Sequence, residues 1–399
     1  MRSTPSRASY DVVIMGGAVV GSATAYFLAA NPQFGGSILV VERDWTYAKS
    51  ATALSASSIR QQFSNALNVR ISQFGLEFIR QAPQLLQVGD ERPDLHLQEN
   101  GYLFLAGPGR GVEVLQRNHR TQTACGADVS LLEPGELVRR FPWIEPEGLA
   151  LASYGESGEG WFDNMGLLNG LRAKARSLGA EYVEAEVVEV LRAGDAVTGV
   201  RLNTGQRIDC GHLVNAAGTR GPKVAAMAGL HLQVEPRRRC QFVFSCPHPL
   251  PGVVPLVIDR SGVFFRPEGR FYLGGMYPEV DPAVDVDDFD VLHEQFDEVI
   301  WPTLAGRVPA FEALKVVNFW AGHYDYCVLD HNVIVGPHPQ VRNFLFANGF
   351  SGHGLQQSPA IGRGLSELIV HGGYRTLDLG PLSYQRVVEQ RPFLEEAVI

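Results

Sequence analysis

The stretch Tyr10–Arg43, YDVVIMGGAVVGSATAYFLAANPQFGGSILVVER, decides the fold of this chain. Its apolar runs predict a strand over 10–15 and a second strand over 37–41, with a glycine-rich turn over 16–21 and a helix over 22–30 between them. Apart from Asp11 and Ser37 near their starts, both strands are apolar, as parallel strands that helices cover on either face must be. The stretch therefore predicts one βαβ unit of an α/β fold.

The glycine-rich turn is a variant of the G-x-G-x-x-G pattern, and it comprises Gly16, Gly17, Ala18, Val19, Val20 and Gly21. Gly16 permits the tight turn, and Gly21 lets the helix pack closely on the strand. Free amide groups and the dipole at the start of the helix favour a pyrophosphate there. Glu42, about 20 residues further on, suits a ribose hydroxyl. The pattern predicts a dinucleotide site, which the methyl of Ala18 weakens without abolishing; a tight turn that binds nothing is the alternative.

The composition excludes several classes of function. The 399 residues include 34 Lys and Arg against 43 Asp and Glu, a net charge of −9, which argues against a nucleic-acid partner. Five cysteines without a CxxC pair indicate free thiols in a reducing compartment. No apolar run reaches the length of a membrane span, and the first residues lack the apolar segment of a secretory signal. We therefore expect a cytoplasmic protein without a transmembrane segment, with a targeting segment removed ahead of residue 1 as the alternative.

The order of predicted elements indicates two domains. Dinucleotide-type α/β segments flank a strand-rich middle, so the chain leaves its first domain and returns to it at the end. We expect a discontinuous Rossmann-like domain from residues 1–90, 145–225 and 325–399. The remaining residues, 91–144 and 226–324, would form an inserted α+β domain on a mainly antiparallel sheet.

A second glycine-rich turn, Gly349–Gln356 (GFSGHGLQ), stands between the last predicted strand and a helix. Another helix start at a glycine-rich loop favours a polar or anionic group held by backbone amides. An ordinary connection between strand and helix is the alternative.

Four motifs together resemble the glycine/D-amino-acid oxidase-like family of FAD oxidoreductases, which includes sarcosine oxidase and glycine oxidase. They are VVIMGGAVVG with Glu42–Arg43, SATALSA (Ser50–Ala56), NAAG (Asn215–Gly218) and GFSGHG (Gly349–Gly354). Their order covers nearly the whole chain. WAGHYDY (Trp320–Tyr326), VGPHP (Val335–Pro339) and GFSGHGLQQ resemble the sarcosine oxidase-like subgroup of FAD-dependent oxidoreductase domain-containing proteins. The resemblance implies a glutathione reductase-type FAD domain with an inserted substrate domain.

The resemblance also implies which residues hold FAD. Gly16–Gly21 would bind the pyrophosphate, and Glu42 and Arg43 the adenosine end. The other implied contacts are Ser50, Ala51, Leu54, Ser55 and Ala56 at the flavin, Val188 at the adenine through its backbone, Ala217 and Gly218 along the ADP moiety, and Gly349, Ser351, Gly352, His353, Gly354 and Leu355 at the pyrimidine end.

The implied reaction takes a hydride from a carbon that bears an amine, and water then hydrolyses the imine. Arg60 resembles the arginine that grips the substrate carboxylate, because a guanidinium fork binds a carboxylate at two points; a surface arginine is the alternative. Gln356 takes the place of a second, lysine ligand of that carboxylate. Tyr324 and Tyr326 would wall the pocket, and His353 would be a structural donor beside the flavin. The implied substrate is an amino acid or an N-substituted amino acid.

Two departures from the family pattern concern the flavin. Tyr272 aligns loosely with the lysine that speeds reaction with oxygen, so a dehydrogenase that passes electrons to a protein or quinone acceptor is favoured over an oxidase. The cysteine that ties flavin covalently in monomeric sarcosine oxidase aligns near Gly322, and Cys327 lies beyond it. We therefore expect non-covalent FAD.

Other readings stay open. Oxidation of a 2-hydroxy acid would need a base, for which His353 or His323 are candidates, and an FAD-holding assembly factor for a respiratory complex is a further alternative. The acidic run Asp285–Asp290 fails the calcium-loop pattern, so no metal is expected. The basic run Arg237–Arg239 is too short for nucleic acid, although a member that faces inward would meet an anionic substrate.

Overall fold

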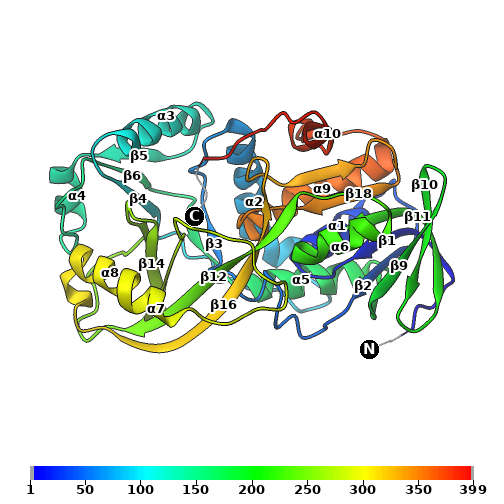
Figure 1. Ribbon diagram of the computed structural model, residues 1–399, viewed down its shortest axis with the longest axis horizontal. Helices are drawn as coiled ribbons and strands as arrows, with labels where there is room; N and C mark the ends of the chain where they lie inside the picture. The colour runs from blue at the N-terminus through cyan, green and yellow to red at the C-terminus, as the bar shows by residue number, and fades with distance from the viewer. Residues whose placement is uncertain (1–3, 397–399) are drawn as a thin grey trace.

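The chain forms two large sheets that lie side by side along the long axis of the molecule (Figure 1). The computed structural model describes residues 4–396. Sheets of mixed orientation, with helices on the first sheet and an inserted second sheet, confirm the predicted α/β class with a dinucleotide-type domain and an inserted α+β domain. No helix within the described residues is long and apolar enough to cross a membrane.

The first sheet has eight strands around a parallel core. β1 (Ser9–Met15) pairs in parallel with β2 (Ile38–Glu42) on one side and β11 (Arg207–Asn215) on the other. The core continues in parallel to β8 and β18, and antiparallel strands complete the rim. The bounds are β8 Glu181–Glu184, β9 Val187–Ala193, β10 Ala196–Leu202, β17 Ile334–Pro337 and β18 Phe344–Asn348.

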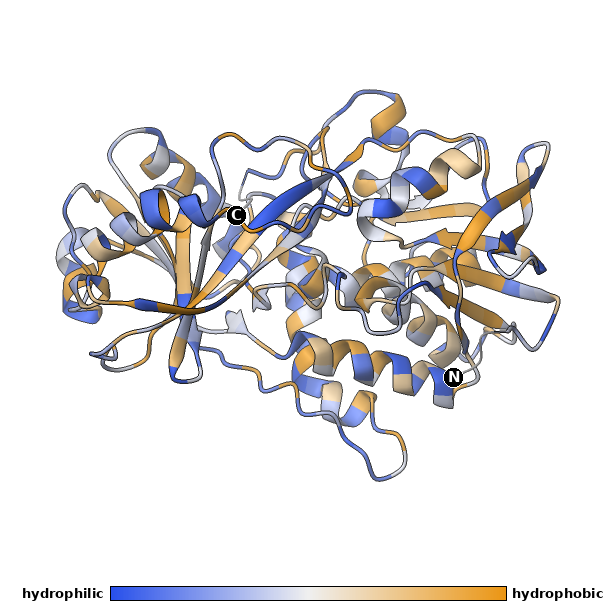
Figure 2. Cartoon of the chain, turned by 60° about the horizontal axis from the view of Figure 1, so that its bottom comes forward, coloured by the Kyte–Doolittle hydropathy of each residue, from blue (hydrophilic) through white to orange (hydrophobic). Residues whose placement is uncertain are grey.

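Apolar sequence explains this core. All five residues of β2 are buried, and Figure 2 shows orange, hydrophobic strands through the first sheet. α1 (Val19–Ala30) packs against α9 (Gly354–His371) and α5 (Asn164–Ser177). The approach to α9 is close because Gly362 has no side chain: a Cβ there would lie 2.6 Å from the backbone of Ala23. The helices are therefore locked over the strand ends that carry the glycine-rich turns.

The second sheet also has eight strands, and it is antiparallel except where β13 meets β4. Its order is β16-β12-β15-β14-β13-β4-β6-β5. The bounds are β4 Tyr102–Ala106, β5 Val129–Leu132, β6 Leu151–Gly155, β12 Val234–Ser245, β13 Leu256–Ile258, β14 Val263–Glu268, β15 Phe271–Met276 and β16 Lys315–Cys327. Helices α3 (Arg110–Ala124), α4 (Pro134–Arg140) and α8 (Trp301–Arg307) belong to this half (Figure 1).

The expected domain boundaries differ from the division between the two sheets at one strand. β6 lies in the second sheet, although residues 145–225 were expected in the first domain. It pairs with β4 and β5, whose apolar faces it completes, so pairing rather than position in the chain decides its place. The long strands β12 and β16 pair from Val234 to Ser245 and run from one half toward the other. The exact boundaries stay a prediction.

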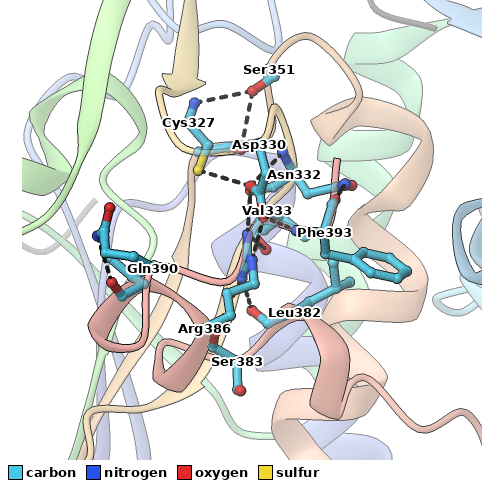
Figure 3. A network of polar contacts seen from close by, with 12 residues as sticks. Cys327, Asp330, Asn332, Val333, Ser351, Leu382, Ser383, Arg386, Gln390 and Phe393 are labelled. Atoms are coloured by element: carbon cyan, nitrogen blue, oxygen red, sulfur yellow. Dashed lines mark hydrogen bonds and ion pairs between the residues drawn. The ribbon is translucent and has the colours of Figure 1, made fainter. Parts of the chain in front are cut away.

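A buried polar network holds the C-terminal segment in place (Figure 3). Arg386 of α10 (Gln385–Val388) donates from Nε to Asp330 Oδ2 at 2.6 Å and from its terminal nitrogens to carbonyls such as that of Asn332. Asp330 also accepts from the backbone amide of Phe393. Because every nitrogen of this guanidinium has an acceptor, the network fixes the tail on the first domain.

Candidate cofactor and substrate site

A long cavity runs from the carboxyl ends of the first sheet's parallel strands to β12 and β16 of the second sheet. It holds about 1880 Å³, including its open mouth. Ligands of open α/β sheets bind outside the carboxyl ends of the strands. The expected cofactor residues that line it are Gly16, Ala18, Val19, Val20, Glu42, Arg43, Ser50, Ala51, Leu54, Ser55, Ala56, Ala217, Gly218, Gly352, Gly354 and Leu355.

The first glycine-rich turn requires its glycines. Gly16 has φ +97°, and a Cβ there would overlap the carbonyl oxygen of Ala216 at the end of β11. A Cβ on Gly21 would overlap the carbonyl oxygen of Gly16. The helix begins directly after Ala18, whose methyl cannot cap it, and Thr52 Oγ1 accepts from the amide of Val19 at 3.3 Å. This first turn borders the cavity, and the amides at a helix start suit the phosphates of a dinucleotide.

Glu42 closes β2 at the cavity wall. Its carboxylate accepts from the amides of Gly17 at 2.7 Å and Asp44 at 2.9 Å. Burial raises the pKa of this carboxyl, and the amide donors oppose that rise. Arg43 and Lys49 also line the cavity and supply positive charge. A carboxylate at the end of the second strand fits a ribose hydroxyl.

The second glycine-rich turn is held by Asp325 of β16. The Asp325 carboxylate accepts from the Gly349 amide at 2.8 Å, and its backbone carbonyl accepts from the Ser351 amide at 3.0 Å. Burial raises the pKa of Asp325 to about 6. Gly352 has φ +95°, and a Cβ there would lie 2.5 Å from the ring of Tyr324. The turn is thus pressed between Asp325 and Tyr324, with Gly352 and Gly354 at the cavity wall.

The residues expected to act on the substrate are only partly brought together. Tyr324 lines the cavity, but Arg60, His353, Gln356 and Tyr326 do not. The guanidinium of Arg60 donates to the Gln62 carbonyl and lies 3.0 Å from His353 Nε2. Because a guanidinium only donates, Nε2 of His353 accepts there. The structure therefore places this pair in buried packing behind the wall.

Gln356 and Tyr326 also face other parts of the protein. The Gln356 side chain accepts from the backbone amide of Arg60 at 2.9 Å and from Ser72 Oγ at 3.0 Å. It ties α9 to the segment after β3 (Ser58–Ile59) instead of reaching the cavity. The hydroxyl of Tyr326 lies 3.2 Å from that of Tyr277.

Besides His353, five expected cofactor residues do not line the cavity. Gly17, Gly21, Gly349 and Ser351 shape the two turns without lining the cavity. Val188 projects an exposed side chain, while its neighbour Val187 lines the cavity. The contact expected of Val188 is through its backbone, and it stays a prediction.

Tyr272 does not stand near the flavin end. It is buried among Phe244, Phe265 and Phe311, and its hydroxyl accepts from the Leu250 amide at 2.9 Å. It is not part of the cavity wall. The loose alignment with an oxygen-activating lysine therefore carries no argument about oxygen.

Sequence reasoning missed several cavity residues, among them Lys49, Arg220 and Gln241, and left Arg239 and His323 without an assigned place. The signal for Arg239 was the basic run Arg237–Arg239, because alternate residues of a strand face opposite sides. The acidic run lies beside it. Arg239 pairs with Asp281, Arg238 with Asp288, and Arg220 with Asp287. These ion pairs hold the segment between β15 and α7 (His293–Gln295) at the cavity, where Asp287 and Phe289 line it.

The fold and the cavity define a two-domain α/β protein that binds a dinucleotide. Residues 11–368 match the family described as FAD dependent oxidoreductase, and the chain belongs to this family. It is 43 % identical to the FAD-dependent oxidoreductase domain-containing protein 1 of Xenopus laevis over 430 residues, which cover 99 % of this chain and 85 % of that protein. It is 26 % identical to the mitochondrial sarcosine dehydrogenase of Mus musculus, over 93 % of this chain and 40 % of that protein.

A solved structure has a similar fold. The L-proline dehydrogenase of P. horikoshii is 25 % identical, with a TM-score of 0.84 over 96 % of this chain and 98 % of that one. The turn that requires glycine at positions 16 and 21, the helix start that borders the cavity, and Glu42 fit FAD, the family's cofactor. Within residues 4–396, no group of three or more His, Cys, Asp or Glu is placed to hold a metal ion.

Proposed function

We propose that this protein uses FAD to oxidise the C–N bond of an amino acid or an N-substituted amino acid. The observation that carries the proposal is a single cavity that joins the dinucleotide turns to a buried arginine, glutamine and tyrosine of the second domain. The names of the relatives agree in substrate class, since they include sarcosine dehydrogenase, glycine oxidase and L-proline dehydrogenase.

When bound, FAD accepts the hydride that leaves the substrate carbon. The protein's part is to hold the substrate and to exclude water. The substrate nitrogen loses a proton, so an imine forms, and water hydrolyses the imine to a carbonyl compound and an amine. Tyr324 is fixed against Gly352 and supplies an apolar wall at the cavity. Arg60, His353, Gln356 and Tyr326 hold this wall in place from behind.

The proposal is tested by the flavin colour under nitrogen. Purified holoprotein is mixed with sarcosine, N-methylalanine, L-proline and iminodiacetate, and the visible absorbance is followed. We expect bleaching by at least one of these amines, with the matching aldehyde or keto acid as product. Bleaching by none of them would contradict the proposal.

We further propose non-covalent FAD. Cysteine is absent from the residues that line the cavity, within the described part of the chain. Cys327 is fully buried, and its Sγ lies 3.3 Å from Asp330 Oδ1. Acid precipitation should therefore release the flavin into the supernatant, whereas flavin retained in the pellet would overturn this point.

We also propose a dehydrogenase that passes electrons to a protein or quinone, in line with the two dehydrogenases among the relatives. Photoreduced holoprotein should then reoxidise slowly in air and quickly with an added quinone. Rapid peroxide formation in air would assign an oxidase instead.

A second candidate, oxidation of a 2-hydroxy acid, is favoured by His323. This residue lines the cavity, and its Nε2 lies 2.7 Å from the Asp288 carbonyl, which can only accept. Nε2 therefore carries the proton, and Nδ1 is an acceptor with no donor among the described residues. Burial lowers the pKa of His323, so the ring is neutral at pH 7 and can take a hydroxyl proton. Bleaching by lactate or 2-hydroxyglutarate, with no bleaching by amines, would decide for this candidate.

A further inference from the structure

Two polar side chains of β12 meet the cavity at its second-domain end. Arg239 and Gln241 are two residues apart, so they lie on the same face of the strand. Both line the cavity, and both are almost fully buried, with 4 % of each residue exposed. Their strand is paired with β16, where Gly322, which also lines the cavity, stands opposite Arg239.

Each of these side chains has an unused hydrogen-bonding atom. The terminal nitrogens of Arg239 donate to the two carboxylate oxygens of Asp281, at 2.7 and 2.8 Å. Its Nε has no acceptor among residues 4–396, and Oε1 of Gln241 has no donor there. Buried polar groups are nearly always paired in folded proteins. A cationic donor and a neutral acceptor, unpaired on one strand face, point to a missing ligand that supplies both partners.

The guanidinium is held in place before any ligand arrives. Its central carbon lies 4.6 Å from the ring centroid of Tyr277 and 4.6 Å from that of Tyr324. Such stacking orients the planar fork without using its N–H groups. Asp281, in contrast, belongs to the irregular segment between β15 and α7, and its side chain is 12 % exposed.

We propose that Arg239 anchors the carboxylate of the substrate and that Gln241 accepts a hydrogen bond from the substrate nitrogen. The ligand is a molecule that carries a carboxylate and an N–H group close together, as an α-amino acid does. Its carboxylate shares the guanidinium with Asp281, which competes with it. This inference rests on the proposed function, and it moves the anchor from Arg60 to the cavity wall.

The test uses binding rather than turnover. Pyrrole-2-carboxylate has the N–H and the carboxylate but no C–H bond next to nitrogen that loses a hydride, and pyrrole-2-carboxamide is its uncharged match. Each is titrated into the holoprotein and followed by calorimetry and by the flavin difference spectrum. We expect the carboxylate to bind at least tenfold more tightly than the carboxamide.

The variants separate charge, geometry and competition. Arg239→Met should weaken binding of the carboxylate at least tenfold and change that of the carboxamide less than twofold, and Arg239→Lys should fall between wild type and Arg239→Met. Asp281→Asn should tighten the carboxylate two- to fivefold, because it removes the competitor. Gln241→Leu should weaken both probes about threefold. Arg237→Met, from the same basic run but outside the cavity, is the matched control and should stay within twofold of wild type.

Carboxylate binding within twofold of wild type in folded Arg239→Met would overturn the inference. If that variant does not fold, Asp281→Asn decides, and unchanged carboxylate affinity there overturns the inference too, as does equal binding of both probes by wild type. These failures are distinct from failure of the proposed function. If amines bleach the flavin but Arg239→Met leaves carboxylate affinity unchanged, the proposed function holds and the anchor lies elsewhere. If carboxylate affinity depends on Arg239 but no amine bleaches the flavin, the binding site holds and the proposed reaction does not.

Discussion

Arg386 and Arg239 are both buried, with 5 % and 4 % of their side chains exposed, and both pair with an aspartate. Their surroundings differ. All three nitrogens of Arg386 donate, to Asp330 and to backbone carbonyls (Figure 3). Arg239 has one nitrogen without an acceptor among the described residues, and it borders a cavity. A satisfied buried arginine stabilises the fold, and a partly satisfied one beside a cavity is available to a ligand.

Arg386→Met should give the largest loss of stability. Asp330 has no exposed surface, and without its partner the buried carboxylate is left uncompensated. We expect the free energy of unfolding to fall by about 3–5 kcal/mol. Urea or thermal unfolding measures the loss, and the double variant Arg386→Met/Asp330→Asn should recover part of it. A loss below 1 kcal/mol would contradict a structural role.

Glu159→Gln tests another buried group whose hydrogen bonds are made, by the dependence of stability on pH. Glu159 is fully buried, accepts from the Gln61 amide at 2.5 Å and Gln62 Nε2 at 2.8 Å, and burial raises its pKa to about 7. The folded protein therefore holds this proton more tightly than the unfolded chain does. The stability that the proton contributes is complete below the usual pKa of Glu and is lost as pH rises to about 7.

The glutamine variant should lack this change. Between pH 4.5 and pH 7, the stability of wild type relative to Glu159→Gln should fall by about 2–3 kcal/mol. Denaturant unfolding at several pH values measures it. Glu156→Gln is the control of opposite sign, because Arg140 lowers the pKa of Glu156 and its effect appears on acidification. If the difference in stability between wild type and Glu159→Gln does not change with pH, burial does not raise the pKa of Glu159.

Gly16→Ala tests the cofactor end of the cavity. The added methyl meets the Ala216 carbonyl, and φ of +97° disfavours any side chain. The turn must shift away from the phosphates, so FAD affinity should fall at least tenfold, about 1.4 kcal/mol. Gly35→Ala is the control, since its Cβ meets nothing within 4 Å. Fluorescence titration of each apoprotein with FAD measures the affinities of the two variants. Equal FAD affinities would show that the turn at Gly16 does not contact FAD.

Arg239→Met should have the smallest effect on stability, about 1 kcal/mol. Asp281 lies in an irregular segment and has 12 % of its side chain exposed, so its carboxylate can turn to water. Thermal unfolding next to Arg386→Met gives the comparison directly. Equal losses in the two variants would mean that Arg239 is as structural as Arg386.

The glycine-rich turns could be predicted from sequence because their constraints are local. Gly16, Gly21 and Glu42 follow one another along a single βαβ unit, and the structure places the turn as expected, with the helix starting at Val19 instead of Ser22. Arg60 and Gln356 could not be placed in this way. Their orientation depends on contacts such as Arg60 to His353 and Gln356 to Ser72, which join distant segments.

The sequence by itself determined the class of fold, the dinucleotide turns and the family, since strand and helix periodicity and tight glycine turns act over short stretches. Only the tertiary structure decided which arginine borders the cavity. β12 and β16 must pair before Arg239 can stand beside Tyr324 and opposite Gly322. The sequence of three arginines does not show which of them faces the cavity, and the strand pairing brings Arg239 to the cavity wall.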